Sequence, residues 1–326
     1  MLQIDSIMKE GRFLHSFLIA WNAILPFIIY LGSGYLTRRS GLVDEAFLQK
    51  LNTMVFRVFF PFLMFWNLYN VEADLSVKGS YIPVCIGSLL LLVLALVLLV
   101  PRIVKDRSKQ SVIIQAAYRS NFVLFGIPMA ESVFGASGAA LATLMVAIIV
   151  PLYNVIAVIL FETYRGGQIK LLTLLKNIVT NPLILGTLIG LAFRLLHIQL
   201  PGAVETPVGA FAALTTPLAL FILGGTLHFA SMKANAKYLW PTMAVKLLLL
   251  PILVTILSSA FGFSNVERFE FLIMAGAPVA VSSYSMAANM GGDGDLAGEF
   301  VALSTVVSLF TLFAFISVYH AVGFIA

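Results

Sequence analysis

One apolar stretch of the chain, residues 111–135, carries side chains that could bind a small anion. Its sequence is SVIIQAAYRSNFVLFGIPMAESVFG, and Arg119 and Asn121 lie near its middle. A guanidinium holds a carboxylate through two parallel hydrogen bonds, and a side-chain amide offers both donors and an acceptor. A charge inside an apolar segment of this length usually faces a cavity or a partner. Both residues are therefore predicted to contact an anionic ligand.

Each of these side chains also has a structural alternative. Asn121 could bond backbone groups that a helix break sets free. Arg119 could snorkel to the interface, or pair with Glu131 or with an acid of the last apolar segment. Glu131 is in turn the predicted residue for coupling transport to a proton, because an ionisable group at such a position is by default functional.

A glycine–proline motif interrupts this stretch and occurs twice in the chain. Gly126 and Pro128 belong to the sequence GIPMA, and the related sequence GAPVA, which contains Pro278, follows 150 residues later. Proline lacks a backbone donor and obstructs a helix, and glycine adds conformational freedom, so both segments are predicted to break at the motif. The helices that restart there would direct free N–H groups, and about half a positive charge, toward the membrane middle.

Polar side chains follow the second motif directly. Ser282 and Ser283 could donate hydrogen bonds to an anion or coordinate a cation, or they could bond the backbone of their own helix. Four asparagines are candidates for supporting groups around the site: Asn67, Asn70, Asn154 and Asn289. Three charged residues near the ends or at one-third depth of apolar segments are expected to snorkel or to form internal salt bridges: Arg57, Lys246 and Glu299.

The composition is that of an integral membrane protein. Of the 326 residues, 60% are hydrophobic and 11% are charged, whereas soluble domains carry about 25% charged residues. The net charge of +5 comes without a basic cluster interleaved with aromatic residues, so nucleic acid is not a predicted partner. Cys85 is the single cysteine and is predicted to be a buried small side chain. Because no metal-ligand spacing, catalytic triad or dinucleotide motif is present, neither an enzyme nor a metal or cofactor is predicted.

Ten segments are long and apolar enough to cross a bilayer, at roughly 20 residues per crossing. Their approximate positions are 17–36, 51–70, 81–101, 111–135, 138–161, 182–200, 207–229, 239–262, 268–289 and 297–323. The predicted fold class is therefore an all-α membrane protein with ten transmembrane helices, of which helices 4 and 9 are broken. Five spans precede the longest polar connection and five follow it. An odd number of spans per half inverts the second half, so two inverted five-helix repeats are predicted, at residues 1–161 and 182–326.

The connections predict the orientation of the chain. Twelve basic residues lie in the connections on one side and five on the other. Since cytoplasmic loops are richer in Lys and Arg, the first side is predicted to be cytoplasmic and both termini to lie outside. The connection 162–181 contains KLLTLLKNIV, which predicts a short helix at the cytoplasmic interface. The sequence GGDGD at 291–295 predicts a helix C-cap followed by an Asp N-cap, because no Glu follows at the spacing of a calcium loop.

Several motifs resemble the auxin efflux carrier family of secondary transporters. They are RSNFVLFGIP at 119–128, GAPVAVSSYSMAANMGGDGDLAGEFVALST at 276–305, NPLILGTLIG at 181–190 and LNTMVFRVFFPFLMF at 51–65. The family includes plant auxin carriers and bacterial malate and malonate permeases. The long cytoplasmic loop of the plant carriers is missing here, which points to the short bacterial type.

The resemblance implies a specific arrangement of the helices. Helices 1, 2, 6 and 7 would form a scaffold and a homodimer surface, and helices 3–5 and 8–10 a moving transport domain. Spans 4 and 9 would cross at Pro128 and Pro278, with the substrate carboxylate near Asn121.

The predicted function is a secondary transporter of small organic anions, such as malate or malonate, in the cell membrane. One rival is a sodium- or proton-coupled carrier of another solute with the same fold. A sodium site would need more carboxylates at depth than Glu131 and Glu299 offer. The other rival is a non-transporting membrane receptor or a channel, although a channel needs a continuous polar pore and only two spans are polar in the middle.

Overall fold

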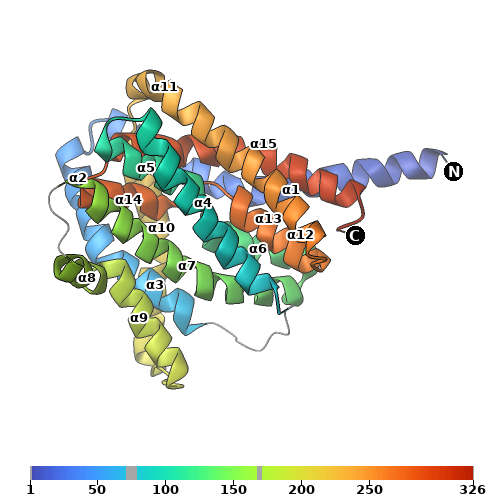
Figure 1. Ribbon diagram of the computed structural model, residues 1–326, viewed down its shortest axis with the longest axis horizontal. Helices are drawn as coiled ribbons and strands as arrows, with labels where there is room; N and C mark the ends of the chain where they lie inside the picture. Colours follow the sequence, from blue (N-terminus) through green and yellow to red (C-terminus); the bar gives the residue numbers. More distant parts are fainter. Residues whose placement is uncertain (1, 71–78, 167–170, 326) are drawn as a thin grey trace.

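The structure, a computed structural model, describes residues 2–70, 79–166 and 171–325, and these residues form helices without a strand. Five helices are long and uninterrupted: α1 (Leu2–Arg39), α4 (Tyr81–Ile103), α7 (Ala136–Tyr164), α10 (Gly202–Thr226) and α15 (Gly294–Ala321). In Figure 1 the start of α1 projects beyond the other helices, and both chain ends lie at the same end of the molecule. An even number of membrane crossings would place both chain ends on the same side of the membrane.

Two further helical stretches contain a wider π-helical turn just before a proline. They are α2 (Glu45–Met54), η1 (Val55–Phe59) and α3 (Phe60–Tyr69), and α11 (Phe229–Ala244), η2 (Val245–Leu249) and α12 (Leu250–Ala260). Pro61 and Pro251 are the second residues of α3 and α12. Because proline lacks an N–H and crowds the carbonyl four residues earlier, the preceding turn widens instead of ending the helix. Arg57 and Lys246 lie in these two turns.

Two segments are each divided into a pair of shorter helices. α5 (Arg107–Tyr118) is followed by α6 (Phe122–Phe134), and α13 (Asn265–Gly276) is followed by α14 (Val281–Met290). These pairs correspond to the fourth and ninth predicted spans. Gly135, with φ +63°, turns the chain directly from α6 into α7.

The remaining helices form the connection between the two halves and its continuation. They are α8 (Leu171–Val179), within the predicted KLLTLLKNIV helix, and α9 (Pro182–Leu195). The two meet at an angle of 63°.

Seven stretches among the described residues are single helices long and apolar enough to span a membrane, and α8 with α9 makes an eighth candidate. The seven coincide with predicted spans 1, 2, 3, 5, 7, 8 and 10. The other three predicted spans fall on α5 with α6, on α9, and on α13 with α14, which are shorter helices. The chain is thus an all-helical protein with seven or eight membrane-span candidates by length, and the count of ten remains a prediction.

Glycines bring α1 close to α10 and α3 close to α9. A Cβ on Gly34 would lie 1.8 Å from the Phe221 carbonyl oxygen, and one on Gly224 would lie 1.9 Å from that of Leu31. In a membrane the hydrophobic effect does not drive helices together, because lipid tails are as apolar as the side chains. Helices associate there by close packing of their backbones at small residues.

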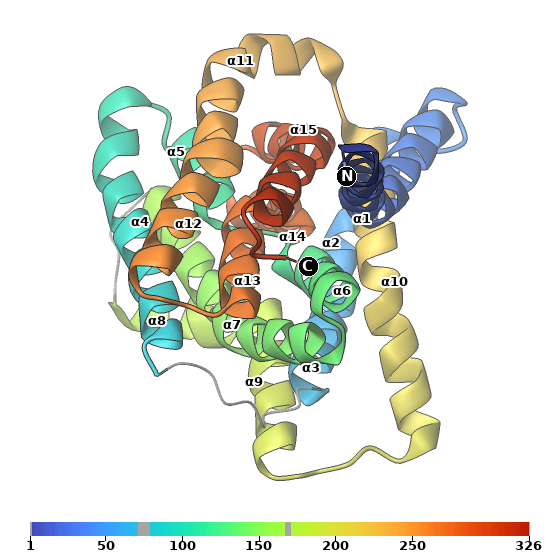
Figure 2. The same ribbon diagram turned by 90° about the vertical axis from the view of Figure 1, so that its right-hand side faces the viewer.

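The contact between α3 and α9 is of the same kind. A Cβ on Gly186 would lie 2.3 Å from the Pro61 carbonyl oxygen, and one on Gly190 would lie 2.5 Å from that of Phe65. Figure 2 shows α1 and α10 on one side of the molecule, α4, α11 and α12 on the opposite side, and α13 and α14 between them.

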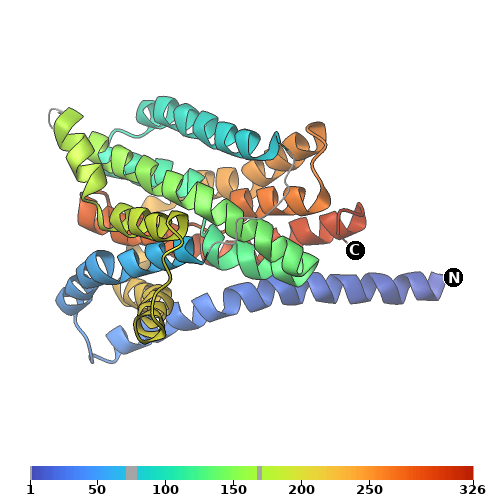
Figure 3. The same cartoon turned by 90° about the horizontal axis from the view of Figure 1, so that it is seen from below.

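Contacts between ionisable side chains join several connections at the end of the molecule opposite the termini (Figure 3). Glu45 lies 3.8 Å from Arg38 and 3.7 Å from His228, and Lys109 lies 3.5 Å from Asp293. These contacts link the connection after α1 with the one after α10, and the connection after α4 with the one after α14. The basic connections identified in the sequence therefore gather at one end.

Two local predictions are confirmed here. Gly291, with φ +84°, ends α14, and the Asp293 carboxylate accepts the Leu296 N–H at 2.9 Å to begin α15, so GGDGD is a cap-to-cap turn. Cys85 is fully buried on α4.

Candidate functional site

The two interrupted segments touch at their interruptions. Ser120 and Val279 form an isolated antiparallel bridge, and the Asn121 N–H donates to the Pro278 carbonyl at 2.7 Å. Backbone polar groups of one break are thus satisfied by the other break, as non-helical backbone at membrane depth requires. Spans 4 and 9 thus meet as the resemblance implies, but the first segment contacts the second at residues 120–121 and not at Pro128.

The break in α13–α14 lies where the proline predicts it. Ala277, just before Pro278, is extended at φ −64° and ψ 152°, which is the conformation that a following proline favours. Pro278 also cannot donate to the Met274 carbonyl four residues earlier. The Ser120 hydroxyl donates to that carbonyl instead, at 2.5 Å, so a side chain of the first break replaces the bond that the second break lacks.

The break in α5–α6 does not lie where the motif predicts it, and that prediction is wrong. The helix is interrupted at residues 119–121, and Pro128 lies well inside α6 with an exposed side chain. Gly126 serves packing, since a Cβ there would lie 2.7 Å from the Phe122 ring. The helix that restarts at the crossing therefore begins at Phe122. Pro128 is tolerated because membrane helices re-satisfy the carbonyl it frees by local adjustments.

The two helices that begin at the crossing differ from α5 and α13, the two helices that lead into it. Asp106 accepts the Ser108 N–H at the start of α5, and Ser264 with Glu267 forms a capping box at the start of α13. No side chain caps the start of α6 or of α14. The first N–H groups of a helix need partners from outside it, and with the helix dipole they favour an anion.

Arg119 is buried at the crossing among neutral groups. Its Nη2 donates to Asn154 Oδ1 at 2.6 Å and to Ser282 Oγ at 2.8 Å, and its Nη1 lies 3.1 Å from the Met286 sulfur. Its side chain is 2% exposed, and Nε has no partner among the described residues. The arginine thus joins α7 and α14 without an opposing charge.

The alternative partners of Arg119 lie elsewhere. Glu131 is exposed near the end of α6. Glu299 on α15 accepts from Asn235 Nδ2 at 2.8 Å and from the Ser231 hydroxyl. The predicted alternative of an ion pair with either acid is therefore wrong, and among the described residues Arg119 makes no salt bridge.

A small cavity of about 40 Å³ lies against the crossing. The cavity lies between α3 and α10 on one side and the two breaks, together with α7 and α14, on the other. Its polar lining consists of Asn67, Arg119, Ser120, Asn121, Tyr153, Thr216 and Ser282. The side-chain nitrogens of Asn67 and Asn121 are buried there without an acceptor, as is the nearby Ser283 hydroxyl. The lining thus offers hydrogen-bond donors that an anion would satisfy.

Lys246 supports the crossing from the opposite side. Its side chain is fully buried, and its Nζ donates to the Ser120 hydroxyl in a close contact. Snorkelling or a salt bridge was expected, and both expectations are wrong among the described residues. The sequence signal was a lysine followed by four leucines and a proline, and only the π turn directs it at Ser120.

The structure brings together part of the predicted set. Arg119, Asn121 and Ser282 line the cavity, Pro278 contributes a carbonyl to the crossing, and Ser283 lies next to it. Gly126, Pro128 and Glu131 lie farther along α6. Two residues that contact or support the site were not singled out as ligands from the sequence: Met286 and Lys246.

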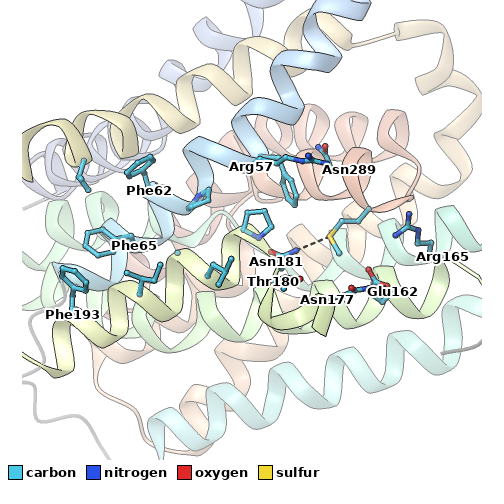
Figure 4. Close-up of a pocket in the computed structure, with 18 of the residues that line it drawn as sticks. Arg57, Phe62, Phe65, Glu162, Arg165, Asn177, Thr180, Asn181, Phe193 and Asn289 are labelled. Atoms are coloured by element: carbon cyan, nitrogen blue, oxygen red, sulfur yellow. Dashed lines mark hydrogen bonds between the residues drawn. The ribbon is translucent and has the colours of Figure 1, made fainter. Parts of the chain in front are cut away.

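A larger groove of about 920 Å³ shares no lining residue with the crossing. It runs along α3 and α9 past the end of α7 (Figure 4). Arg57, Arg165 and Asn289 lie toward one end and Phe65 and Phe193 toward the other. It is therefore a separate pocket from the candidate site.

Comparison with known proteins identifies the family. A family described as membrane transport protein matches residues 19–316. An uncharacterized transporter of Methanothermobacter thermautotrophicus is 24% identical over 297 residues, covering 91% of this chain and 97% of that protein. A "putative malonate transporter" of Rhizobium meliloti is 23% identical over 299 residues, covering 89% and 92%. An uncharacterized transporter of Methanocaldococcus jannaschii is 24% identical over 307 residues, covering 90% and 97%. The chain therefore belongs to the auxin efflux carrier family of membrane transport proteins.

Proposed function

We propose that the protein is a secondary transporter of small organic anions, mono- or dicarboxylates such as malonate or malate, and that the anion binds at the crossing of the two breaks. The observation that carries this proposal is Arg119, a buried guanidinium whose partners are all neutral. A buried charge without an opposite charge is costly. A substrate carboxylate supplies the missing charge in the geometry that the guanidinium fork favours.

The donors around Arg119 support an anionic rather than a cationic substrate. Asn121 lines the cavity and its amide nitrogen is buried without an acceptor, and the starts of α6 and α14 carry no side-chain cap. Hydrogen bonds to a charged group are worth about 1.5–3 kcal/mol each, so two or three of them give useful affinity. The name of the Rhizobium meliloti relative favours malonate as the first substrate to test.

The size of the cavity supports a cycle in which helices move. A volume of about 40 Å³ is close to that of one water molecule and too small for a dicarboxylate. Substrate entry therefore requires that α3 and α10 separate from the breaks and α14. Such relative motion of two helix groups around a fixed site is alternating access.

The proposal extends to topology. Ten spans would form two inverted repeats, at residues 1–161 and 182–326. The glycine contacts of α1 with α10 and of α3 with α9 support it, because exchanging the two halves converts one pair into the other. The basic connections would face the cytoplasm and both termini the outside. The lipid-facing sides of α1, α3, α9 and α10 would form the homodimer surface.

The test is uptake into proteoliposomes. Purified protein is reconstituted, and uptake of labelled malonate, malate and a monocarboxylate is measured under proton and sodium gradients. Arg119→Gln should lower kcat/KM about 100-fold, which corresponds to the loss of two charge-assisted hydrogen bonds at about 1.5 kcal/mol each. Arg57→Gln is the matched control, because this arginine is exposed and lies outside the crossing. Its uptake should equal that of the wild type.

Two results would overturn the proposal. One is the absence of uptake of every carboxylate under every gradient, with transport of an uncharged or cationic solute instead. The other is equal uptake by the wild type and Arg119→Gln, which would remove the role given to the buried charge.

A further inference from the structure

We propose that Glu270 binds the coupling proton of this transporter, an inference that rests on the proposed transport function. Glu270 lies in the second turn of α13, the helix that leads to the Pro278 break. Its side chain is fully buried, and neither carboxylate oxygen has a hydrogen-bond partner among the described residues. An ionisable group of this kind in a membrane segment is a candidate functional site.

The part of α13 around Glu270 is buried on several faces. Phe269 and Phe271 on either side of it are fully buried, and their rings contact Phe134 at 5.5 Å and Phe263 at 6.5 Å between centroids. An ionised carboxylate in this position would lack both water and an opposite charge, whereas the neutral acid can be accommodated. The packed arrangement therefore belongs to a carboxyl group that carries a proton.

The charged groups on the helices around α13 are engaged elsewhere. α13 packs against α6, α7, α12, η2 and α15. Lys246 of η2 donates to Ser120, Glu131 of α6 is exposed, and Glu299 of α15 is bound by Asn235. α12 carries no Asp, Glu, Lys, Arg or His.

Other titratable groups of these helices have their own contacts. Tyr153 of α7 packs against Tyr118, Tyr319 of α15 bonds Thr255, and His320 of α15 bonds the Ile316 carbonyl. Glu162 of α7 accepts from Asn177, and Tyr164 lies at the end of the same helix. Asp295 of α15 lies in its first turn, at the opposite end of the molecule from α13's start.

On α13 itself, Glu267 closes the capping box, and Arg268 lies 4.5 Å from the Phe324 ring centroid. From α4, Tyr81 is close enough to Glu270 for the two to interact electrostatically. The Tyr81 hydroxyl, like the two Glu270 oxygens, has no hydrogen-bond partner among the described residues, so the two groups do not bond each other.

The position of Glu270 along α13 gives its proton a short route to water. Ser264, just before the helix, is exposed. Glu270 follows Asn265 by five residues, which is about 8 Å along the axis at 1.5 Å per residue. The carboxyl group therefore lies close to the exposed start of α13, and packed side chains separate it from water there. Rearrangement of α13 during the cycle would hydrate it, release the proton and link release to the step that opens the crossing.

Glu131, the acid that the sequence favours for coupling, has a different environment. It is exposed near the end of α6, so its surroundings need not change between access states. Glu131 is therefore the matched control for Glu270, because both residues are glutamates on helices of the two crossing segments, α6 and α13.

The test compares accumulation with exchange in proteoliposomes. Labelled malonate, or whichever carboxylate the wild type moves, is followed with an inward gradient of one pH unit, and separately as substrate exchange at equal pH. With one proton per substrate, the wild type should accumulate substrate up to about tenfold, since one pH unit is a factor of ten in proton activity. Glu270→Gln should keep exchange within about threefold of the wild type and lose the accumulation. Glu131→Gln should behave like the wild type.

A second measurement does not depend on transport. Infrared spectra of the wild type should contain the C=O stretch of a protonated carboxyl group that is missing from Glu270→Gln and retained in Glu131→Gln. Glu270→Asp, with a thermal unfolding curve for each variant, guards against a folding defect.

The outcomes separate the two proposals. The absence of carboxylate transport by the wild type sinks the proposed function, while the infrared band still reports whether Glu270 carries a proton. Full accumulation by Glu270→Gln, loss of accumulation in Glu131→Gln alone, or no difference in the infrared band each overturns the assignment to Glu270.

Discussion

The two breaks reach similar geometry by different means. The break in α13–α14 contains Pro278, which lacks a donor and holds the preceding residue extended. The break in α5–α6 consists of Arg119, Ser120 and Asn121, none of which forbids a helix. Its side-chain bonds run to distant parts of the chain, from Arg119 to Asn154 and from Ser120 to Met274, and the Asn121 N–H donates to the carbonyl of Pro278. The break at Pro278 is therefore determined by the local sequence. The break at residues 119–121 is determined by tertiary contacts, some of which come from the Pro278 break.

This difference shows why a repeated motif need not mark a repeated structure. GIPMA and GAPVA are 150 residues apart, but the bridged residues Ser120 and Val279 are not. The proline of the second motif, Pro278, breaks its segment, whereas the proline of the first motif, Pro128, lies inside α6.

The largest effect on stability should come from the serine that links the breaks. Ser120→Ala removes the acceptor of the Lys246 ammonium and the donor to the Met274 carbonyl. We expect a loss of about 2–3 kcal/mol of unfolding free energy, because the buried Lys246 amino group and the Met274 carbonyl both lose their partner. Ser304, whose hydroxyl accepts the Val279 N–H at 2.9 Å, is the counterpart at the other break. Ser304→Ala should cost about 1 kcal/mol.

Thermal unfolding in detergent measures both variants. If Lys246 is the cause, Ser120→Ala should cost much less in a Lys246→Met background, as a double-mutant cycle would reveal. An equal cost in the two backgrounds would contradict this explanation.

The next largest effect concerns substrate affinity at the two breaks. Asn121→Ala removes a free donor at the start of α6, and Ser282→Ala removes one anchor of Arg119 in α14. We expect KM to rise about 30-fold for Asn121→Ala and about fivefold for Ser282→Ala, equivalent to losses of about 2 and 1 kcal/mol. Initial rates of uptake at varied substrate concentration give both values. The reverse order would show that the proline-containing break dominates binding.

Replacing Pro278 and Pro128 by alanine should change the stability of the protein in opposite directions. Pro278→Ala permits a continuous α13–α14 helix that competes with the crossing, so we expect a loss of about 1 kcal/mol and slower uptake. Pro128→Ala restores a hydrogen bond inside α6, where proline is unfavourable, so we expect a gain of about 1 kcal/mol with uptake unchanged. Melting temperatures of the pair are compared under one condition. A shift of the same sign for both would mean that Pro128 also shapes the crossing.

The smallest effect concerns the surface cap of α5. Hydrogen bonds from the Ser108 hydroxyl and backbone N–H to Asp106 hold the pKa of this carboxyl below its usual value. Because the folded-state pKa is depressed, this stabilisation is present above the ordinary pKa near 4 and is lost as the pH falls through the folded-state pKa. Asp106 is exposed, so Asp106→Asn should lower stability at pH 7 by less than about 1 kcal/mol.

Melting temperatures at pH 7 and pH 3 check this, and the difference between Asp106→Asn and the wild type should narrow at the lower pH. Ser264→Ala tests the other surface cap, on α13, through a hydroxyl that does not titrate. It should lower the melting temperature at both pH values.

The sequence predicted part of the candidate site because polar groups in lipid-length segments are rare and conspicuous. Arg119, Asn121 and Ser282 are visible from their setting alone, and the structure brings all three to one cavity. Asn154 was only one of four asparagines, and its contact with Arg119 depends on the position of α7. Lys246 and Glu270 could not be ranked from sequence, because a buried charge and a snorkelling one look alike until the surrounding helices are placed.

What the sequence determined by itself is set by local chemistry: the membrane class from its apolar content, the apolar spans, the cap-to-cap turn at 291–295 and the break at Pro278. What only the tertiary structure decided is where the first segment breaks, and that Arg119 and Lys246 are held by neutral groups and Glu270 by none. The physical reason is that a proline acts on its own helix, whereas the partners of Arg119 and Lys246 lie 35 to 167 positions away along the chain.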